Sequence, residues 1–369
     1  MPVSASLPEF PWDTLADAKA LAGVHPDGIV DLSVGTPVDP VAPVIREALA
    51  AASAAPGYPA TAGTARLRES AVAALGRRFG ITGLGADAVL PVIGTKEFIA
   101  WLPTLLGLGA ADAIVVPELA YPTYEVGARL AGAQVLRADS LTQLGPQSPA
   151  LIYLNSPSNP TGRVLGPDHL RKVVGWARER GVVVASDECY LGLGWGPEPP
   201  VSVLHPSVCD GDHTGLLAVH SLSKSSSLAG YRAGFVAGDP GLVAELLAVR
   251  RHAGMMVPTP VQAAMVAALD DDAHDRLQRE RYARRRAALA PALRSAGFVI
   301  DHSEGGLYLW ATRGEPCRDS VAWLARRGIL VAPGEFYGPA GAQHVRVALT
   351  ATDERISAAV GRLTAPVAA

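Results

Sequence analysis

The feature that most limits how this chain can fold is an alternation of short β-branched runs with amphipathic stretches of helical period. The runs expected to be strands are at residues 113–117, 134–137, 150–155, 182–187, 216–222 and 232–237. Helical stretches such as 122–131 and 167–180 lie between them. Because several of these strands are apolar on both faces, helices must cover the sheet on both sides. The pattern therefore predicts an α/β large domain of three layers, α/β/α, with a mostly parallel sheet.

A different pattern begins after Pro240. Helices are expected in succession at 240–252, 260–269 and about 271–295, and the last of them is rich in arginine. Strands of a second, mixed sheet are expected at 298–302, 306–312, 329–332 and 344–349, with covering helices near 318–327 and 352–363. The N-terminal residues contain no clear βα unit and are expected to pack on this second sheet. We therefore predict a large domain over 46–270 and a smaller α+β domain formed by 1–45 and 271–369.

The composition is that of a compact globular protein, since 49% of the 369 residues are hydrophobic. The 32 basic and 35 acidic residues nearly balance, so neither nucleic acid nor an anionic membrane is an expected partner. The 3 cysteines have no paired spacing, which argues against a disulfide framework and favours a cytoplasmic protein. We expect no signal peptide and no transmembrane segment, because no apolar run of suitable length is present.

A lysine, Lys224, lies in a hydroxyl-rich segment at the end of the expected strand 216–222. A buried lysine amine becomes a nucleophile toward aldehydes once its pKa is lowered. Ser221, Ser223 and Arg232 supply the neutral donors and the guanidinium that bind a phosphate. An aldehyde and a phosphate on one small molecule describe pyridoxal 5′-phosphate, which we predict as the cofactor. The alternative is a serine-rich surface loop with an incidental lysine.

Two polar clusters follow expected strands, at the edge where open α/β sheets bind ligands. Asn159 begins the tight turn Asn-Pro-Thr-Gly, and its amide can donate to a phenolate oxygen. Asp187 ends the strand at 182–187 and can pair with a protonated ring nitrogen, while Tyr190 can donate to the ring oxygen. The Asp-Glu pair at 187–188 is also compatible with a metal or phosphate-hydrolase site, but no glycine-rich Walker loop precedes it. We expect no metal.

A third cluster, residues 92–97, is a glycine turn that opens a helix. Backbone N–H groups at the start of a helix bind phosphate, and Gly94 and Thr95 stand at this start. Lys96 either adds charge to the same pocket or is a solvated helix residue.

In chain order, these motifs resemble the class I and II aminotransferases among the fold-type I enzymes that depend on pyridoxal 5′-phosphate. The resemblance covers nearly the whole chain. It rests on Gly94-Thr95, Tyr121-Pro122, Asn159-Pro160-Thr161-Gly162, the segments 187–190, 221–224 and 230–232, and Arg346. It implies a ping-pong transamination in which Lys224 forms the Schiff base with the cofactor and acts as the general base.

The resemblance implies roles for further residues. Asp187 pairs with the pyridine nitrogen, Tyr190 and Asn159 hold the ring oxygen, and Tyr121 stacks on the ring. The cofactor-binding residues implied are Gly94, Thr95, Lys96, Tyr121, Asn159, Asp187, Tyr190, Ser221, Ser223, Lys224, Arg232 and Tyr58. Tyr58 corresponds to the tyrosine that reaches the phosphate of a neighbouring subunit, which implies a homodimer with shared active sites.

Arg346 matches the family arginine that grips the substrate α-carboxylate, with Asn159 beside it. An arginine inside an alternating strand needs an anion, and the alternative to a substrate is an internal salt bridge. Gly35 resembles the N-terminal glycine that closes over the same carboxylate.

A closer resemblance, at residues 7–13, 32–39, 58–61 and 94–103, is to the actinobacterial succinyldiaminopimelate transaminases of lysine and diaminopimelate biosynthesis. It implies N-succinyl-L,L-2,6-diaminopimelate as amino donor and 2-oxoglutarate as acceptor. Because both carry a distal carboxylate, a second cation must face the pocket. The candidates are Lys96, and Arg250, Arg251 or His252 from a segment that could reach a neighbouring subunit. The rival interpretations are a transaminase of aspartate, alanine or aromatic amino acids, and a carbon–sulfur β-lyase on the same fold.

Two charged clusters have plainer interpretations. The acidic residues 270–272 with His274 are expected to cap a helix start and not to bind a metal. The arginine-rich stretch 279–286 is expected to be the solvated face of a long helix and not a nucleic-acid site.

Overall fold

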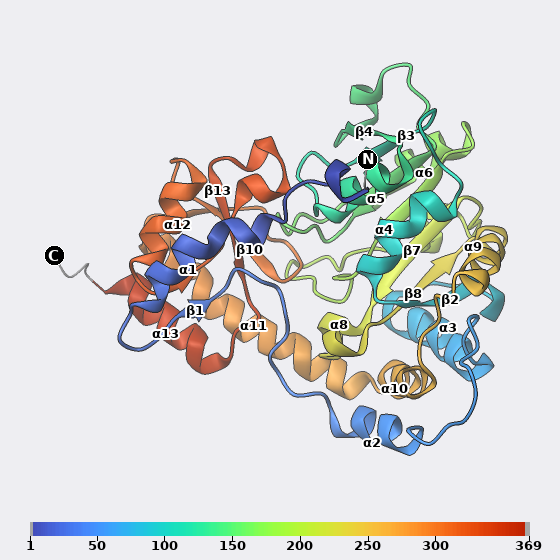
Figure 1. The fold of residues 1–369 in the computed structure, drawn as a ribbon, viewed down its shortest axis with the longest axis horizontal. Coiled ribbons are helices and arrows are strands. Elements are labelled where there is room, and N and C mark those ends of the chain that lie inside the picture. Colours follow the sequence, from blue (N-terminus) through green and yellow to red (C-terminus); the bar gives the residue numbers. More distant parts are fainter. Residues whose placement is uncertain (1–2, 366–369) are drawn as a thin grey trace.

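A seven-stranded sheet forms the centre of the fold in the computed structural model, which describes residues 3–365 (Figure 1). Its strands, in the order β2-β8-β7-β6-β5-β3-β4, are β2 (Val89–Ile93), β3 (Ala113–Val116), β4 (Gln134–Arg137), β5 (Leu151–Asn155), β6 (Val183–Asp187), β7 (Leu216–Ser221) and β8 (Ala233–Gly238). Strand β8 is antiparallel to β2 and β7, and the other pairings are parallel. The predicted mostly parallel sheet is confirmed.

Two hydrophobic cores lie on opposite faces of this sheet. Val184 and Leu216 join one core, whereas the next residue of each strand, Ala185 and Leu217, joins the other. The first core is closed by α3 (Ala65–Phe79), α6 (Pro167–Arg178) and α10 (Thr259–Asp270), and the second by α4 (Thr95–Leu105), α5 (Thr123–Ala131) and α9 (Pro240–His252). Because successive residues of a strand point to opposite faces, these strands are apolar throughout, and the three layers are confirmed.

The second sheet differs from the expected one. Its order is β12-β13-β10-β9, with β9 (Val299–Asp301), β10 (Tyr308–Thr312), β12 (Ala332–Pro333) and β13 (His344–Ala348). All its pairings are antiparallel, so the expectation of a mixed sheet is wrong. The parallel pairing is a separate ladder between β1 (Val30–Asp31) and β11 (Ile329–Leu330). The strand expected at 329–332 is therefore split, because its first half pairs with β1 and its second half with β13.

A separate hydrophobic core fills the space around the second sheet. It is covered by α11 (Asp272–Ser295), α12 (Cys317–Ala325) and α13 (Asp353–Thr364). The N-terminal helix α1 (Ala16–Gly23) packs against α12, and Figure 1 shows this segment beside the C-terminal elements. Helix α2 (Pro43–Ala51) instead packs on α10. The remaining helices α7 (Pro206–Cys209) and α8 (Leu222–Ser225) are short. The domain boundaries near residues 46 and 270 stay a prediction.

Helix α11 contacts both α10 and the strands β9 and β10 of the second sheet. Its start was predicted to be a helix cap, and its arginines were predicted to form a solvated face. The Asp271 carboxylate accepts hydrogen bonds from the backbone N–H groups of residues 273 and 274, so the predicted helix cap is confirmed. The expected solvated face is wrong at Arg285. This side chain is buried and bonds both oxygens of Asp39 at 2.6 and 2.8 Å, and Asp353 at 2.6 Å, which compensates its charge. Within residues 3–365, no helix is long and apolar enough to cross a membrane.

Candidate active site

A cavity of about 660 Å³ lies where β5, β6 and β7 end. The structure brings most of the predicted site residues to its wall. They are Gly35, Thr95, Lys96, Tyr121, Asn159, Asp187, Tyr190, Ser221, Ser223, Lys224, Arg232 and Arg346. Tyr58 is not among them; its side chain is 97% exposed. Polar groups gather here because the carboxyl ends of parallel strands meet at one edge of a sheet.

Lys224 lies in the short helix α8, which begins where β7 ends. The hydroxyl of Ser221 caps this helix by accepting from the Ser223 N–H at 3.1 Å. The Lys224 Nζ donates to the carbonyl of Gly35, and the Tyr282 hydroxyl donates to the Lys224 carbonyl at 3.0 Å. Burial lowers the pKa of Lys224, because water no longer stabilises the ammonium form. The amine is therefore both fixed in place and easier to deprotonate than an exposed lysine.

The start of α4 and the guanidinium of Arg232 form a cradle for an anion. Gly94 has a φ of +75°, and a Cβ at this position would lie 2.1 Å from Arg232 Nη2, so only glycine fits. Arg232 is itself held by a hydrogen bond from Nη1 to the Ala229 carbonyl at 2.9 Å. Thr95, Ser221 and Ser223 line the same cavity as Arg232. A helix N-terminus, hydroxyls and a guanidinium together are what a phosphate group binds.

Asp187 ends β6 and is buried. Its Oδ2 accepts from the Tyr124 hydroxyl at 2.8 Å, and its Oδ1 accepts from the Cys189 N–H at 3.2 Å. Burial raises the pKa of Asp187, and the hydrogen bonds from Cys189 and Tyr124 oppose this effect. A buried carboxylate of this kind is favoured by a nearby cation, and a protonated pyridine nitrogen provides one. Tyr124 was not predicted from the sequence. Burial raises its pKa and so keeps the hydroxyl in its neutral, donating form.

Tyr190 contacts Tyr308, a residue that the sequence did not reveal, and Asn159 contacts Arg346. The hydroxyls of Tyr190 and Tyr308 lie 3.1 Å apart, with the rings edge to face. The Asn159 Oδ1 accepts from Arg346 Nη1 at 2.8 Å, so the amide of Asn159 presents its N–H groups as donors. Tyr308 also explains Gly35, since a Cβ there would lie 2.1 Å from the tyrosine oxygen.

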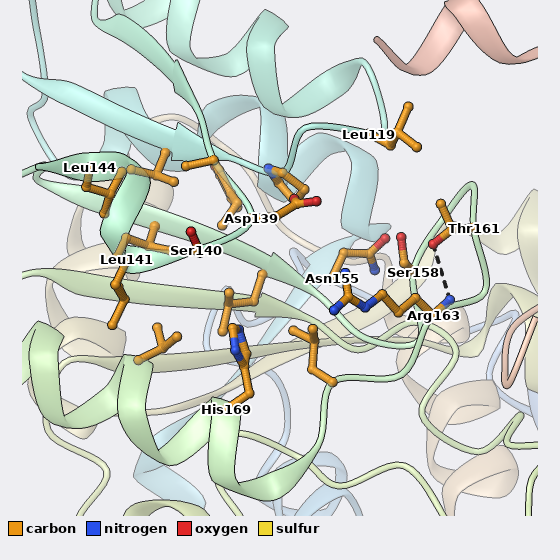
Figure 2. A pocket seen from close by; sticks show the side chains of 18 of the residues that line it. Leu119, Asp139, Ser140, Leu141, Leu144, Asn155, Ser158, Thr161, Arg163 and His169 are labelled. Carbon is orange, nitrogen blue, oxygen red and sulfur yellow. Dashed lines mark hydrogen bonds between the residues drawn. The ribbon is translucent and has the colours of Figure 1, made fainter. Parts of the chain in front are cut away.

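The turn that carries Asn159 is held from behind by Asn155, the last residue of β5. Asn155 Oδ1 accepts from the Asn159 N–H at 2.7 Å, and its Nδ2 donates to the Asp187 carbonyl at 2.9 Å. Figure 2 shows Asn155 with Ser158, Thr161 and Arg163 at the edge of a separate pocket of about 130 Å³ behind the turn. The asparagine thus ties the two strand ends that carry the predicted cofactor contacts.

Arg346 lies in β13 and is only 2% exposed. Its Nη1 bonds Asn159, and its Nη2 donates to the Ser33 carbonyl at 2.7 Å. Its guanidinium lies 4.0 Å from the ring centroid of Tyr308. Both hydrogen-bond acceptors are neutral, and within residues 3–365 its buried Nε has no hydrogen-bond partner. The internal salt bridge considered from the sequence is not found in the described part of the chain, so the charge is available to an anion from outside.

The four candidates for a second cation differ in burial, in ion pairing and in whether they line the cavity. The prediction of Arg250 as the second cation is wrong, because Arg250 is 0% exposed and donates to both carboxylate oxygens of Glu97 at 3.0 and 3.1 Å. Its charge is therefore compensated inside the protein. Arg251 and His252 do not line the cavity of their own chain, and their reach into a neighbouring subunit stays a prediction. Lys96 does line it, and its Nζ lies 5.6 Å from the ring centroid of Phe10 and 5.8 Å from that of Tyr121.

Comparison with known proteins fixes the family. A model described as aminotransferase class I and II matches residues 27–363. The chain belongs to the class I and II aminotransferases. It is 86% identical over 362 residues to a probable aminotransferase of Mycobacterium tuberculosis, covering 98% of this chain and 86% of that protein. It is 60% identical to a 4-dedimethylamino-4-oxo-anhydrotetracycline transaminase of Streptomyces rimosus, covering 97% of this chain and 99% of the relative.

Solved structures agree. A probable N-succinyldiaminopimelate aminotransferase of Thermus thermophilus superposes with a TM-score of 0.87 at 28% identity, covering 96% of this chain and 99% of that one. Aminotransferases of this family depend on pyridoxal 5′-phosphate. The cavity fits that cofactor: Lys224 for the aldehyde, the Gly94 and Arg232 cradle for the phosphate, and buried Asp187 for the ring nitrogen.

Proposed function

We propose that this aminotransferase transfers the amino group of N-succinyl-L,L-2,6-diaminopimelate to 2-oxoglutarate, a step of lysine and diaminopimelate biosynthesis. The observation that carries the proposal is a pair of cations in one cavity, Arg346 and Lys96. Each lies against an aromatic side chain of the same N-terminal segment. Lys96 lies near the ring of Phe10, and the Arg346 guanidinium lies 5.9 Å from the ring centroid of Trp12. Both proposed substrates carry an α-carboxylate and a distal carboxylate, so two cations match them.

The roles of the chain's own residues follow from the geometry. When bound, pyridoxal 5′-phosphate supplies an electron sink for the charge left at the substrate α-carbon. Arg346 binds the α-carboxylate with the guanidinium N–H groups that Asn159 and Ser33 leave unused. Lys224, made less basic by burial, removes the α-proton as general base and later returns it. Asp187 holds the negative charge that keeps the ring nitrogen protonated.

We further propose that the active site is completed by a second copy of the chain. Tyr58 is almost fully exposed, so its side chain is free to contact a second copy of the chain. Its proposed role is to reach the phosphate in the neighbouring subunit. Hybrid dimers provide the test. Mixing inactive Tyr58→Ala and Lys224→Ala proteins should restore activity, because one site of the hybrid has both intact residues; no recovery in proven hybrids would refute the shared site.

A second candidate function is the amination of a polycyclic ketone. It is supported by the identity of 60% to the tetracycline-pathway transaminase of Streptomyces rimosus over nearly the whole of both chains. The aromatic wall of Phe10, Trp12 and Tyr121 is compatible with a flat substrate. The two candidate functions differ in whether they require the charge of Lys96, because a ketone without a distal carboxylate needs no second cation.

A panel of amino donors, scored by the glutamate formed from 2-oxoglutarate, tests the proposed function. Succinyldiaminopimelate should give the highest kcat/KM among donors that include aspartate, alanine and aromatic amino acids. If one of the other donors is used far better, the proposed substrate is wrong. Release of pyruvate and ammonia from cystathionine without any keto acid would instead indicate a β-lyase.

The role of Lys96 needs a separate variant. Lys96→Met removes the charge and retains a stem that packs on the aromatic rings. Lys96 is exposed, so the KM for 2-oxoglutarate should rise about two- to fivefold, as for the loss of a surface ion pair of up to about 1 kcal/mol. The KM for pyruvate, which has no distal carboxylate, should stay unchanged. Lys172→Met, at an exposed position of α6, is the matched control. An unchanged KM for 2-oxoglutarate in Lys96→Met would exclude Lys96 as the distal cation.

A further inference from the structure

Directly behind the cofactor cavity, β6 and β7 bury a second pair of titratable side chains. Glu188, next to Asp187, is 3% exposed, and His220 of β7 is 5% exposed. The distance from Glu188 Oε2 to His220 Nε2 is 3.7 Å, which is too long for a hydrogen bond. Within residues 3–365, neither atom has another hydrogen-bond partner. Two buried polar atoms therefore face each other without being satisfied, which is costly unless something lies between them.

Both residues line one small cavity of about 50 Å³. A single water molecule needs roughly 10–15 Å³ of such space and two to four polar partners. The cavity is therefore large enough for a water, and Oε2 and Nε2 are suitable partners. Cys189 and Ser221 belong to the walls of both this cavity and the cofactor cavity, so the two are immediate neighbours.

The surroundings favour an uncharged pair. The His220 ring is stacked between Phe79 and Phe235, with centroid distances of 6.3 and 5.1 Å, and burial lowers its pKa to about 3. Burial likewise raises the pKa of Glu188 to about 7, and this effect outweighs the opposing hydrogen bonds from the Val203 N–H, at 2.8 Å, and from the side chains of Ser202 and Ser186. A histidinium and a carboxylate at this place would both lose hydration, so the neutral forms are preferred.

The other charged groups around the cavity do not provide a counter-ion for Glu188. Arg78 bonds Asp272 at 2.7 Å and lies 3.8 Å from Asp275, and Arg279 donates to a backbone carbonyl. The remaining neighbour is the Asp187 carboxylate, whose negative charge disfavours a second one beside it. None of these charged groups therefore stabilises the ionised form of Glu188.

We propose that Glu188 and His220 bind one water molecule between them, and that Glu188 keeps its proton there so that Asp187 can carry the buried negative charge. The inference rests on the proposed role of Asp187 at the cofactor ring. If Glu188 ionised, repulsion would shift protons toward Asp187 and weaken its pairing with the ring nitrogen. Glu188 is then a positioning residue, which acts on the cofactor only through its neighbour.

Infrared spectroscopy of the cofactor-free protein tests the protonation directly. At pH 6, the wild type should show the C=O stretch of a buried, protonated carboxyl group, and Glu188→Gln should lack it. His220→Leu should retain the band at a shifted frequency, because the water that bonds the carboxyl group loses its second partner. Glu179→Gln, an exposed position, is the matched control and should leave the band unchanged. A Glu188→Gln spectrum identical to that of the wild type in this region would overturn the proposal.

The holoenzyme supplies the functional readout. In the wild type, kcat/KM and the protonated-ring absorbance should decline above pH 7 by about tenfold, the effect of one pKa unit on Asp187. Glu188→Gln, which cannot ionise, should lose this decline and keep its activity at lower pH. A merely structural role would lower activity equally at all pH values and would contradict the proposal. Asp187→Asn separates the two claims: if it is inactive while Glu188→Gln shows the wild-type profile, the proposed function stands and only the role of Glu188 fails.

Discussion

Removing the guanidinium of Arg346 should produce the largest loss of substrate binding of any change outside Lys224. In Arg346→Ala, Asn159 Oδ1 and the Ser33 carbonyl lose hydrogen bonds of 2.8 and 2.7 Å, and the substrate carboxylate is buried without a cation. Truncating one partner of a buried, hydrogen-bonded charge pair costs about 2–5 kcal/mol. Since about 1.36 kcal/mol is a factor of ten, kcat/KM should fall by roughly 30- to 5,000-fold.

The assay is the initial rate of glutamate formation, with each substrate varied in turn. Arg346→Lys should lie between the wild type and alanine, because it keeps the charge and loses the fork that makes two parallel bonds. Arg66→Ala is a suitable control, since this arginine pairs with Asp270 on the surface. If Arg346→Ala retains kcat/KM within about twofold for both substrates, the carboxylate is bound elsewhere and the reasoning fails.

Three further predictions concern the cofactor and the stability of the fold. Tyr124→Phe removes the hydroxyl that donates to the buried aspartate of β6 at 2.8 Å. Single-turnover rates should fall about 10- to 150-fold, as for the loss of a hydrogen bond of about 1.5–3 kcal/mol to a charged group. Unchanged rates would show that this hydrogen bond does not support catalysis. Gly94→Ala should weaken cofactor binding at least about tenfold in a fluorescence titration, because the new Cβ would displace Arg232. The control Gly107→Ala, at a φ of +74° with open space around it, should leave cofactor binding unchanged. Equal effects of the two changes would point to backbone strain alone. The pKa of Asp272 is lowered to about 2, chiefly by a hydrogen bond from an arginine of α3, so its contribution to stability is present above pH 3.8 and is lost as the pH falls toward 2. Because the pair is partly exposed, Asp272→Asn should cost less than about 1 kcal/mol in urea unfolding at pH 6 and nothing near pH 2; a loss independent of pH would contradict this assignment.

The central sheet could be predicted, apart from its edge strand β2, because its strands are apolar on both faces, a pattern typical of a sheet that helices cover on both sides. The same pattern placed Asp187 and Ser221 correctly at strand ends, and thereby in one cavity. Local sequence also predicted the glycine turn at the start of α4. These features depend on residues that are close together in the sequence, so a single sequence is sufficient to predict them.

Contacts between distant segments could not be predicted in this way. Tyr124 reaches Asp187 from a helix 63 residues earlier, and in sequence it is an ordinary aromatic residue. Arg250 was a candidate for the second cation until the fold paired it with Glu97, 153 residues away. Arg285 is similar, because its partner Asp39 lies 246 residues away and belongs to the N-terminal segment. A charged side chain far from its partner in sequence looks solvated until the tertiary structure is known.

The most direct test of the proposed active site is to find which residue bears the cofactor. The protein loaded with pyridoxal 5′-phosphate is reduced with borohydride, digested, and mapped by mass spectrometry. We expect a phosphopyridoxyl label on Lys224, the lysine that burial makes less basic at the end of β7. Lys224→Ala should carry no label at this position and should lack transaminase activity. A stoichiometric label on another lysine, or full activity in Lys224→Ala, would contradict the proposed active site.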